Sequence, residues 1–299
     1  MIEMSKETIW AITSAVLLFS LVVSMQSVEL SSANFFPPSI PSPAIIINAD
    51  GSIEPLTAPI KRFNDLYTFT SNIIGYSIVV QRNNLTVDGA GFTLQGNGNS
   101  VGVFLQDTQN ITVKNLTIKG FYRGIWFTWG MALNQGAKNN IIINNTITNN
   151  TYGINCALFT SNNTITENTI TGNECGIYIS YSPYNVLRGN RLSENLYNLW
   201  VDCLLSHQGY GFINDIDSSN TVDGKPVYYW VGETNKTVPS DAGYVALIKC
   251  WGITVEGLTL SHNGQGVLLV ETNNSKVTQN NITQNNYGVS LFGMYSPCT

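Results

Sequence analysis

Residues 139–156, NNIIINNTITNNTYGINC, decide the fold, because their pattern returns along most of the chain. The same layout occurs in SNNTITENTITGNECGIYI at 161–179, YNVLRGNRLSENLYNLWV at 184–201 and NSKVTQNNITQNNYGVSL at 274–291. Each stretch contains a Gly, or once an Asn, followed by alternating apolar residues. These anchor positions return about every 22 residues, at Gly102, Gly124, Gly153, Gly176, Asn198, Tyr244, Gly266 and Gly288, apart from one longer loop and one longer break. A recurrent period of this size indicates a solenoid.

The apolar columns of the repeat indicate which solenoid it is. Apolar residues stand one and three places after the anchor, as Ile177 and Ile179 do after Gly176. Alternation with period two is typical of strands, and no part of the repeat shows the helical period of 3.6. The sequence therefore predicts an all-β parallel β-helix of about nine turns, each coiling short strands around an apolar interior.

Two features of the repeat are expected at its corners: the anchor glycine and a recurrent asparagine. Gly at the anchor predicts a corner where the backbone takes a left-handed conformation. Asn recurs eight places before the anchor, at Asn145, Asn168, Asn190 and Asn280. These side chains are predicted to stack as an internal amide ladder, each bonding to the next turn.

The repeat sets the domain organisation of the chain. Residues 55–299 are predicted to form the β-helix, with an N-terminal cap at 55–95 and an irregular insertion at 207–243. Soon after Gly288 the chain stops without a polar cap. Solenoids normally protect an open end. A truncated C-terminus or a partner at this end, through end-to-end association, are the two interpretations.

The N-terminal residues predict export. Residues 9–25, IWAITSAVLLFSLVVSM, are mostly apolar; Lys6 precedes them, and no other Lys or Arg occurs before Lys61. This asymmetry predicts that the repeat lies outside the cell. Residues 1–33 are predicted to be a cleaved signal peptide, with an uncleaved membrane anchor helix as the alternative. Residues 34–54, which begin with the Pro-rich NFFPPSIPSP, are predicted to be a linker.

Composition agrees with a place at the cell surface. Charged residues make up 11% of the chain and the net charge is −5, so nucleic acid is not an expected partner. The five cysteines lack metal-ligand spacing, and Cys156 falls in an inward column, which predicts a buried thiol. Sequons at Asn84, Asn149, Asn162, Asn235 and Asn273 are the glycosylation candidates. Chance occurrence of sequons in Asn- and Thr-rich turns is the alternative.

Three segments carry a family resemblance: VDGAGFTLQG at 87–96, NTVDGKPVYYW at 220–230 and the repeat itself. Together they resemble the NosD-like family, within the wider group of right-handed β-helix domains of carbohydrate-binding proteins and sugar hydrolases. The opening IIINADGSIEPLTAPI at 45–60 is similar to archaeal surface members of this group. The resemblance implies a right-handed helix and an exported protein, and implies function only loosely.

The founding members of that family assist maturation of the copper site of nitrous oxide reductase. Copper would require clustered His, Met or Cys. Here His207 and His262 are the only histidines, and Met1, Met4 and Met25 lie in the export segment. The sequence therefore disfavours a copper role, and no cofactor or metal is expected.

An outward column supports a binding function. The residue two places after each anchor is expected to point outward, because its neighbours point inward. Over five consecutive turns this column reads Phe104, Trp126, Asn155, Tyr178 and Trp200. Aromatic faces spaced along a rod suit sugar rings, so Phe104, Trp126, Tyr178 and Trp200 are the predicted carbohydrate-binding residues. Mutual stacking that only stabilises neighbouring strands is the alternative.

Three functional hypotheses follow. The first is a non-catalytic, exported cell-surface protein that binds polysaccharide or surface glycans. The second is a polysaccharide lyase, hydrolase or epimerase. Glycosidases need carboxylates about 5–9.5 Å apart, and neighbouring regular turns carry no such pair. Asp215, Asp217 and Asp223 in the irregular segment are the catalytic candidates, with solvated loop acids as the alternative. The third is a structural repeat protein of a surface assembly.

Overall fold

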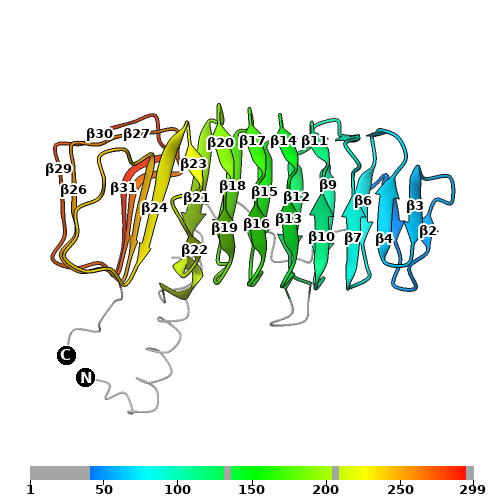
Figure 1. Ribbon diagram of the computed structural model, residues 1–299, viewed down its shortest axis with the longest axis horizontal. Coiled ribbons are helices and arrows are strands. Elements are labelled where there is room, and N and C mark those ends of the chain that lie inside the picture. Colours follow the sequence, from blue (N-terminus) through cyan, green and yellow to red (C-terminus); the bar gives the residue numbers. More distant parts are fainter. Residues whose placement is uncertain (1–40, 131–135, 204–208, 294–299) are drawn as a thin grey trace, which may run out of the picture. The chain divides into compact units, whose positions relative to one another are not determined.

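Short parallel strands stack along residues 41–130, 136–203 and 209–293, the parts of the chain that the computed structural model describes (Figure 1). These described residues make about ten turns, one more than the repeat predicted, and contain almost no helix. Residues 44–222 are called the first part of the chain, and the described residues after them the last part. In the first part, each complete turn gives one strand to each of three sheets. The predicted all-β parallel solenoid is confirmed.

The three sheets are named sheet A, sheet B and sheet C. Sheet A consists of β2 (Ile53–Glu54), β1 (Ala44–Ile47), β6 (Ser77–Val80), β9 (Val101–Gln106), β12 (Arg123–Thr128), β15 (Tyr152–Ala157), β18 (Cys175–Ser180) and β21 (Tyr197–Asp202). Sheet B consists of β22 (Asp215–Ile216), β19 (Val186–Arg188), β16 (Thr164–Thr166), β13 (Ile141–Ile143), β10 (Ile111–Lys114), β7 (Leu85–Asp88), β4 (Leu66–Phe69) and β3 (Ile60–Phe63).

Sheet C is the longest and runs into the last part of the chain. It consists of β31 (Tyr287–Phe292), β28 (Gln265–Val270), β25 (Tyr244–Ile248), β24 (Lys225–Val231), β23 (Thr221–Val222), β20 (Arg191–Ser193), β17 (Thr169–Thr171), β14 (Thr146–Thr148), β11 (Thr117–Lys119), β8 (Thr93–Gln95) and β5 (Ile73–Ile74). Two small sheets complete the last turns: β26 (Thr254–Glu256) with β29 (Lys276–Thr278), and β27 (Thr259–Ser261) with β30 (Asn281–Thr283).

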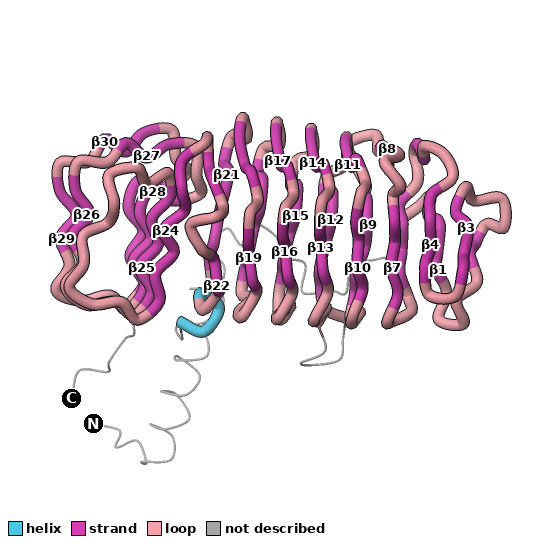
Figure 2. The backbone as a smooth tube through the Cα atoms, viewed as in Figure 1, coloured by secondary structure: helices cyan, strands magenta, loops and turns pink. Residues whose placement is uncertain are grey.

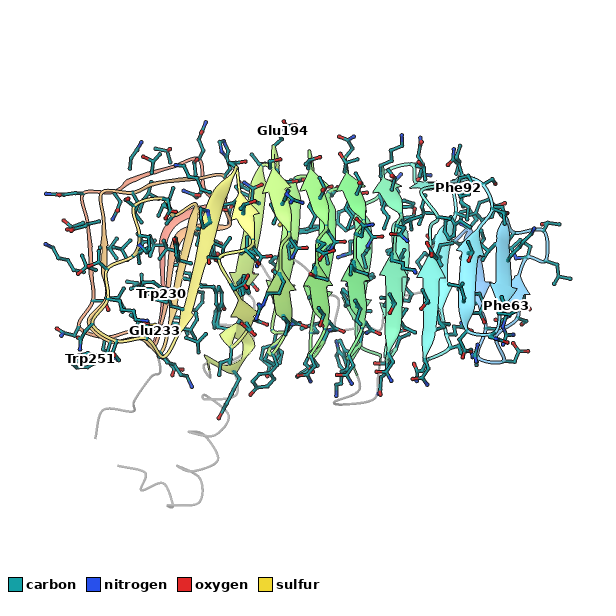
Figure 3. The ribbon with its side chains drawn as sticks, in the orientation of Figure 1. Phe63, Phe92, Glu194, Trp230, Glu233 and Trp251 are labelled. Atoms are coloured by element: carbon teal, nitrogen blue, oxygen red, sulfur yellow. The ribbon has the colours of Figure 1, made fainter. Side chains whose placement is uncertain are left out.

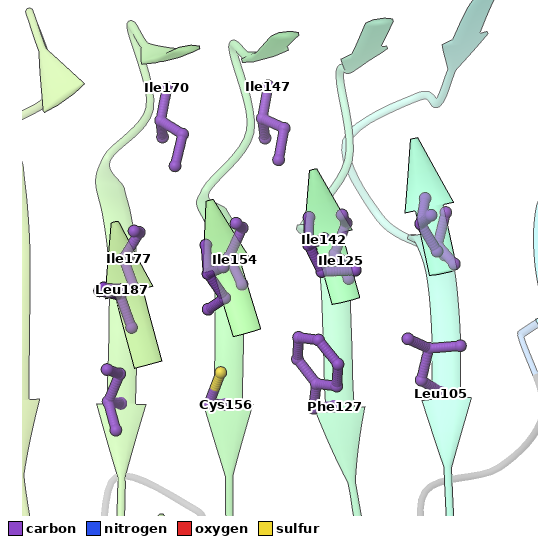
Figure 4. Close-up of a cluster of buried hydrophobic side chains, with 14 of the residues drawn as sticks. Leu105, Ile125, Phe127, Ile142, Ile147, Ile154, Cys156, Ile170, Ile177 and Leu187 are labelled. Atoms are coloured by element: carbon purple, nitrogen blue, oxygen red, sulfur yellow. The ribbon is translucent and has the colours of Figure 1, made fainter. Parts of the chain in front are cut away.

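The alternating apolar columns form the interior. Ile125, Phe127, Ile154 and Cys156 are all 0% exposed and stack turn upon turn (Figure 4). Because a strand turns successive side chains to opposite faces, the residues between them point outward. The predicted buried thiol of Cys156 is confirmed.

Asparagine ladders run along all three corners of the first part. They are Asn140–Asn163–Asn185–Asn214, Asn145–Asn168–Asn190–Asn220 and Asn150–Asn173–Asn195. At each step the Oδ1 atom accepts from the Asn one turn earlier; for Asn168, the backbone N–H and Nδ2 of Asn145 both lie at 3.0 Å. The predicted ladder is therefore confirmed for Asn145, Asn168 and Asn190, and two more accompany it. Asn280 was predicted to belong to it, but it bonds to the backbone of Leu258 and Val255 rather than to another asparagine.

The anchor glycines have a different role from the one predicted. Gly153 and its equivalents do not have positive φ. Positive φ occurs instead at residues that include several just before ladder asparagines, such as Asn144 at 55° and Asn149 at 54°. A Cβ on Gly153 would lie 2.5 Å from the carbonyl oxygen of Gly176 on the next turn. The prediction of a left-handed anchor was wrong, because close approach between turns, not φ, excludes a side chain there.

One dislocation interrupts the stacking of the described strands, between β23 and β24, which are both labelled in Figure 1; Figure 2 shows the backbone of the same region. These strands pair antiparallel, whereas β20 with β23 and β24 with β25 pair parallel. The strands that follow the later anchors, β25, β28 and β31, therefore extend sheet C rather than sheet A. Val245 and Leu247 face a second interior, while Ala246 and Leu268 join the core of the first part. The predicted irregular insertion at 207–243 thus contains two regular strands, β22 and β23, before the dislocation.

The structure also revises the N-terminal boundary. Residues 44–54, predicted to belong to the linker, contain β1 and β2, and β1 pairs parallel with β6 in sheet A. The four-residue strand β1 was missed because the Pro-rich composition of the preceding residues favoured a linker. The predicted signal peptide or anchor at 1–33 lies outside the described residues. Within the described ranges, no helix is long and apolar enough to cross a membrane.

Candidate functional site

The outward side of β9, β12, β15, β18 and β21 is called the aromatic face below. Its central column is Phe104, Trp126, Asn155, Tyr178 and Trp200, one residue per strand, directly paired in the parallel register. The column predicted from the repeat is thus brought together as expected. Strands in a sheet lie about 4.8 Å apart, so β12 and β21 are separated by about 14 Å.

A second column widens the face. Arg123, Tyr152, Cys175 and Tyr197 pair with one another one place before the anchors. Sequence reasoning missed this column, although aromatic or basic residues precede several anchors. Its rings contact the central column: the centroids of Tyr152 and Tyr178 lie 5.7 Å apart, and those of Tyr197 and Trp200 also lie 5.7 Å apart.

The rings of the aromatic face are not equally available. Phe104 is 1% exposed and packs with Val79 and Val101, so it is not part of the candidate site. Trp126, Tyr178 and Trp200 are partly exposed. Tyr178 and Trp200 meet edge to face with centroids 5.3 Å apart, an arrangement that aromatic pairs favour.

Arg123 lies among three rings of the face. Its Cζ atom is 4.2 Å from the centroid of Trp126, 4.6 Å from that of Tyr122 and 5.8 Å from that of Tyr152. These distances are typical of cation–π contacts. Burial lowers the pKa of the Arg123 guanidinium, because water no longer solvates the charge fully.

A carboxyl group lies at the far end of the face. The hydroxyl of Tyr178 donates to Oδ2 of Asp202 at 2.6 Å. Asp202 is 5% exposed, and its burial raises the pKa of its carboxyl group. The other carboxylate oxygen, Oδ1, has no hydrogen-bond partner.

Buried polar atoms without partners concentrate on this face. Among the described residues eight side-chain polar atoms are buried without a hydrogen bond. Five of them lie here: Arg123 Nε, Trp126 Nε1, Asn155 Oδ1, Trp200 Nε1 and Asp202 Oδ1. Native proteins satisfy most buried polar groups, so the atoms without a partner on this face call for an explanation.

Two family models match the chain. The model described as "Right handed beta helix region" matches residues 76–242, more than half of the chain. The chain belongs to the right-handed β-helix family. A second model, "Periplasmic copper-binding protein (NosD)", matches residues 193–296 of this β-helix protein and agrees with the NosD-like resemblance. The periplasmic description supports an exported protein. Neither the curated proteins nor the solved structures contain a match.

The predicted catalytic acids of the β-helix protein are engaged in structural contacts. Asp215 and Asp217 both pair with Arg188, Asp217 through Nε at 3.1 Å. Asp223 lies at another corner of the same turn, where its Oδ2 accepts from Nδ2 of Asn198 at 3.1 Å. The structure therefore joins two of the three acids through one arginine and leaves the third apart.

The remaining candidates lie away from the aromatic face. The five glycosylation candidates are all exposed: Asn84, Asn149, Asn162, Asn235 and Asn273. Trp230 and Trp251 lie on the last part of the chain (Figure 3), with Trp251 51% exposed. In the described ranges, no group of three or more His, Cys, Asp or Glu is arranged to hold a metal ion.

Proposed function

We propose that this exported β-helix protein binds carbohydrate through its aromatic face. The observation that carries the proposal is the combination of partly exposed rings with buried polar atoms that have no partner, on the same strands. Sugar rings offer apolar C–H faces to aromatic rings and hydroxyl groups to polar atoms. A binding site of this kind needs both, because the polar groups fix orientation.

The size of the face suits a chain rather than a single small molecule. Trp126 and Trp200 stand on strands separated by about 14 Å, with Asn155 and Tyr178 on the two strands between them. Three rings and one amide therefore line the stacking direction. We propose that an extended sugar chain lies along this direction and contacts all four strands.

Binding without cleavage is the form of the proposal. Glycosidases place two carboxyl groups about 5–9.5 Å apart. Within β9, β12, β15, β18 and β21, Asp202 is the single acidic residue. Asp215 and Asp217 are held by Arg188 on sheet B. These contacts favour a binding protein over a lyase, hydrolase or epimerase.

The description of the second family model names copper binding. The described side chains of this protein do not offer a suitable set of copper ligands. His262 is the one described histidine, and its Nδ1 lies 3.5 Å from Oδ2 of Asp223. Burial raises the pKa of the Cys156 and Cys175 thiols, which opposes the thiolate form that metals bind. His207 and every Met fall outside the described ranges. Copper therefore has no part in the proposal.

Retention on immobilised polysaccharides tests the proposal. We expect Trp126→Ala combined with Trp200→Ala to abolish retention, because two ring faces are lost. The matched control is Trp230→Ala combined with Trp251→Ala, which removes two tryptophans from another part of the chain. Equal retention of both double variants and the parent protein, with unchanged thermal melting, would contradict carbohydrate binding by the aromatic face.

A further inference from the structure

Arg123 is the one basic residue in the strands of sheet A. By contrast, Arg188 at the end of β19 pairs with two aspartates. Arg123 makes no ion pair with a described carboxylate, and its Nε atom is buried without a hydrogen bond. A cation in this position lacks the anion that normally accompanies it.

The rings around Arg123 orient it for a ligand. Tyr122, Trp126 and Tyr152 surround the guanidinium at 4.6, 4.2 and 5.8 Å. Contacts with several rings hold the planar group in place and exclude water without neutralising its charge. A guanidinium prepared in this way matches an oxyanion with two parallel N–H···O bonds.

We infer that the ligand of the aromatic face is an anionic sugar chain, and that Arg123 binds its carboxylate or sulfate group. This inference rests on the proposed function and adds the chemical class of the glycan. The sugar ring that carries the anion stacks beside Trp126, on the strand that carries Arg123.

Asp202 fits the same chain at its other end. It lies on β21, about 14 Å from β12 along the stacking direction, and at the opposite end of its strand from the Arg123 column. This separation keeps its carboxyl group from repelling the anion. Its free Oδ1 accepts a hydrogen bond from a hydroxyl group of the sugar. The face therefore binds the chain in one direction, with the anionic group toward Arg123.

Isothermal titration with paired glycans tests the inference. The probes are oligogalacturonide and its carboxyl-reduced counterpart, together with dextran sulfate and unsulfated dextran. The variants are Arg123→Gln, which removes the charge, and Arg123→Lys, which keeps the charge but not the planar fork. Arg191→Gln is the matched control, since Arg191 is an exposed arginine of β20 in sheet C. Thermal melting of each variant checks that it folds.

The expected result is a preference for one charged probe over its neutral counterpart. Arg123→Gln should lower that affinity about ten- to hundredfold, Arg123→Lys should lower it less, and Arg191→Gln should leave it unchanged. The charged probe that binds identifies the anion as carboxylate or sulfate. Equal affinity for charged and neutral probes, unaffected by Arg123→Gln, would overturn the inference and leave carbohydrate binding intact. Failure of all four probes to bind would overturn both.

Discussion

In the first part of the chain, sheets A, B and C share one interior but differ on the outside. Their inward residues are of the same kind: Ile154 of sheet A, Ile142 of sheet B and Ile147 of sheet C are all 0% exposed. Outward, β14 and β17 present threonines, whereas sheet A presents rings, Arg123 and Asp202. The interior therefore determines the solenoid, and the outward residues of one sheet are free to take on a function.

The largest expected effect tests what the sheets share. Asn168→Ala removes the acceptor of Asn145 and leaves the carbonyl groups of Ile142 and Thr166, each 2.9 Å from Nδ2, without that donor. Each buried polar group left without a partner costs about 1–3 kcal/mol, so we expect a loss of about 3–5 kcal/mol in the free energy of unfolding. Urea denaturation measures it.

Thr169→Ala is the matched control, because this neighbouring side chain points outward from β17. Its expected change lies within about 0.5 kcal/mol. Similar losses for both variants would show that the ladder is not a special source of stability.

An intermediate effect tests the close approach of turns. Gly153→Ala places a Cβ 2.5 Å from the carbonyl oxygen of Gly176, so we expect a loss of about 1–3 kcal/mol. In Gly288→Ala, at the same place of the last described turn, the nearest atom is 3.9 Å away. That substitution should be neutral or stabilise by about 0.5 kcal/mol. Thermal melting compares the two, and equal destabilisation would refute the packing explanation.

The smallest expected effect concerns Asp202 of sheet A and the dependence of stability on pH. Burial raises the pKa of Asp202 above its ordinary value of 3.8, so the folded protein holds this proton more tightly than the unfolded chain. Stability should therefore fall as the pH rises from 3.8 through the raised pKa. Asp202→Asn cannot titrate and should lack this fall.

Thermal melting of both proteins between pH 3 and 7 at constant salt gives the measurement. Stability differences that stay constant across the interval would mean that Asp202 titrates alike in both states. Above the raised pKa of Asp202, the stability of the variant minus that of the wild type should be larger than at pH 3, because the wild type then has a buried charge.

Much of the fold could be predicted because the repeat imposes the same choice on every turn. Ile142, Ile165 and Leu187 fill one column, and each additional turn repeats the evidence for it. The dislocation at β24 could not be predicted, since the anchor pattern resumes unchanged at Tyr244. The antiparallel pairing of β23 with β24 places β25 and the equivalent later strands in sheet C instead of sheet A. The strand at 44–47 was missed because it lies before the first anchor, and its pairing with β6 is visible only in the structure.

The candidate site was predictable only in part. The outward direction of Trp126, Tyr178 and Trp200 follows from strand alternation, which is local. The burial of Phe104 depends on Val79 of another turn, and the rings around Arg123 come from Tyr122 and Tyr152 as well as its own strand. Contacts of this kind depend on which turns become neighbours and on how far each side chain reaches.

The sequence by itself determined the all-β solenoid, its inward columns and one of its asparagine ladders, because period-two alternation and a fixed turn length are properties of the local chain. Only the tertiary structure decided where sheet A ends, why Gly153 must lack a side chain, and which polar atoms of the aromatic face lack partners. The physical reason is that burial, close approach and hydrogen bonding are relations between turns, and no single turn of the sequence contains them.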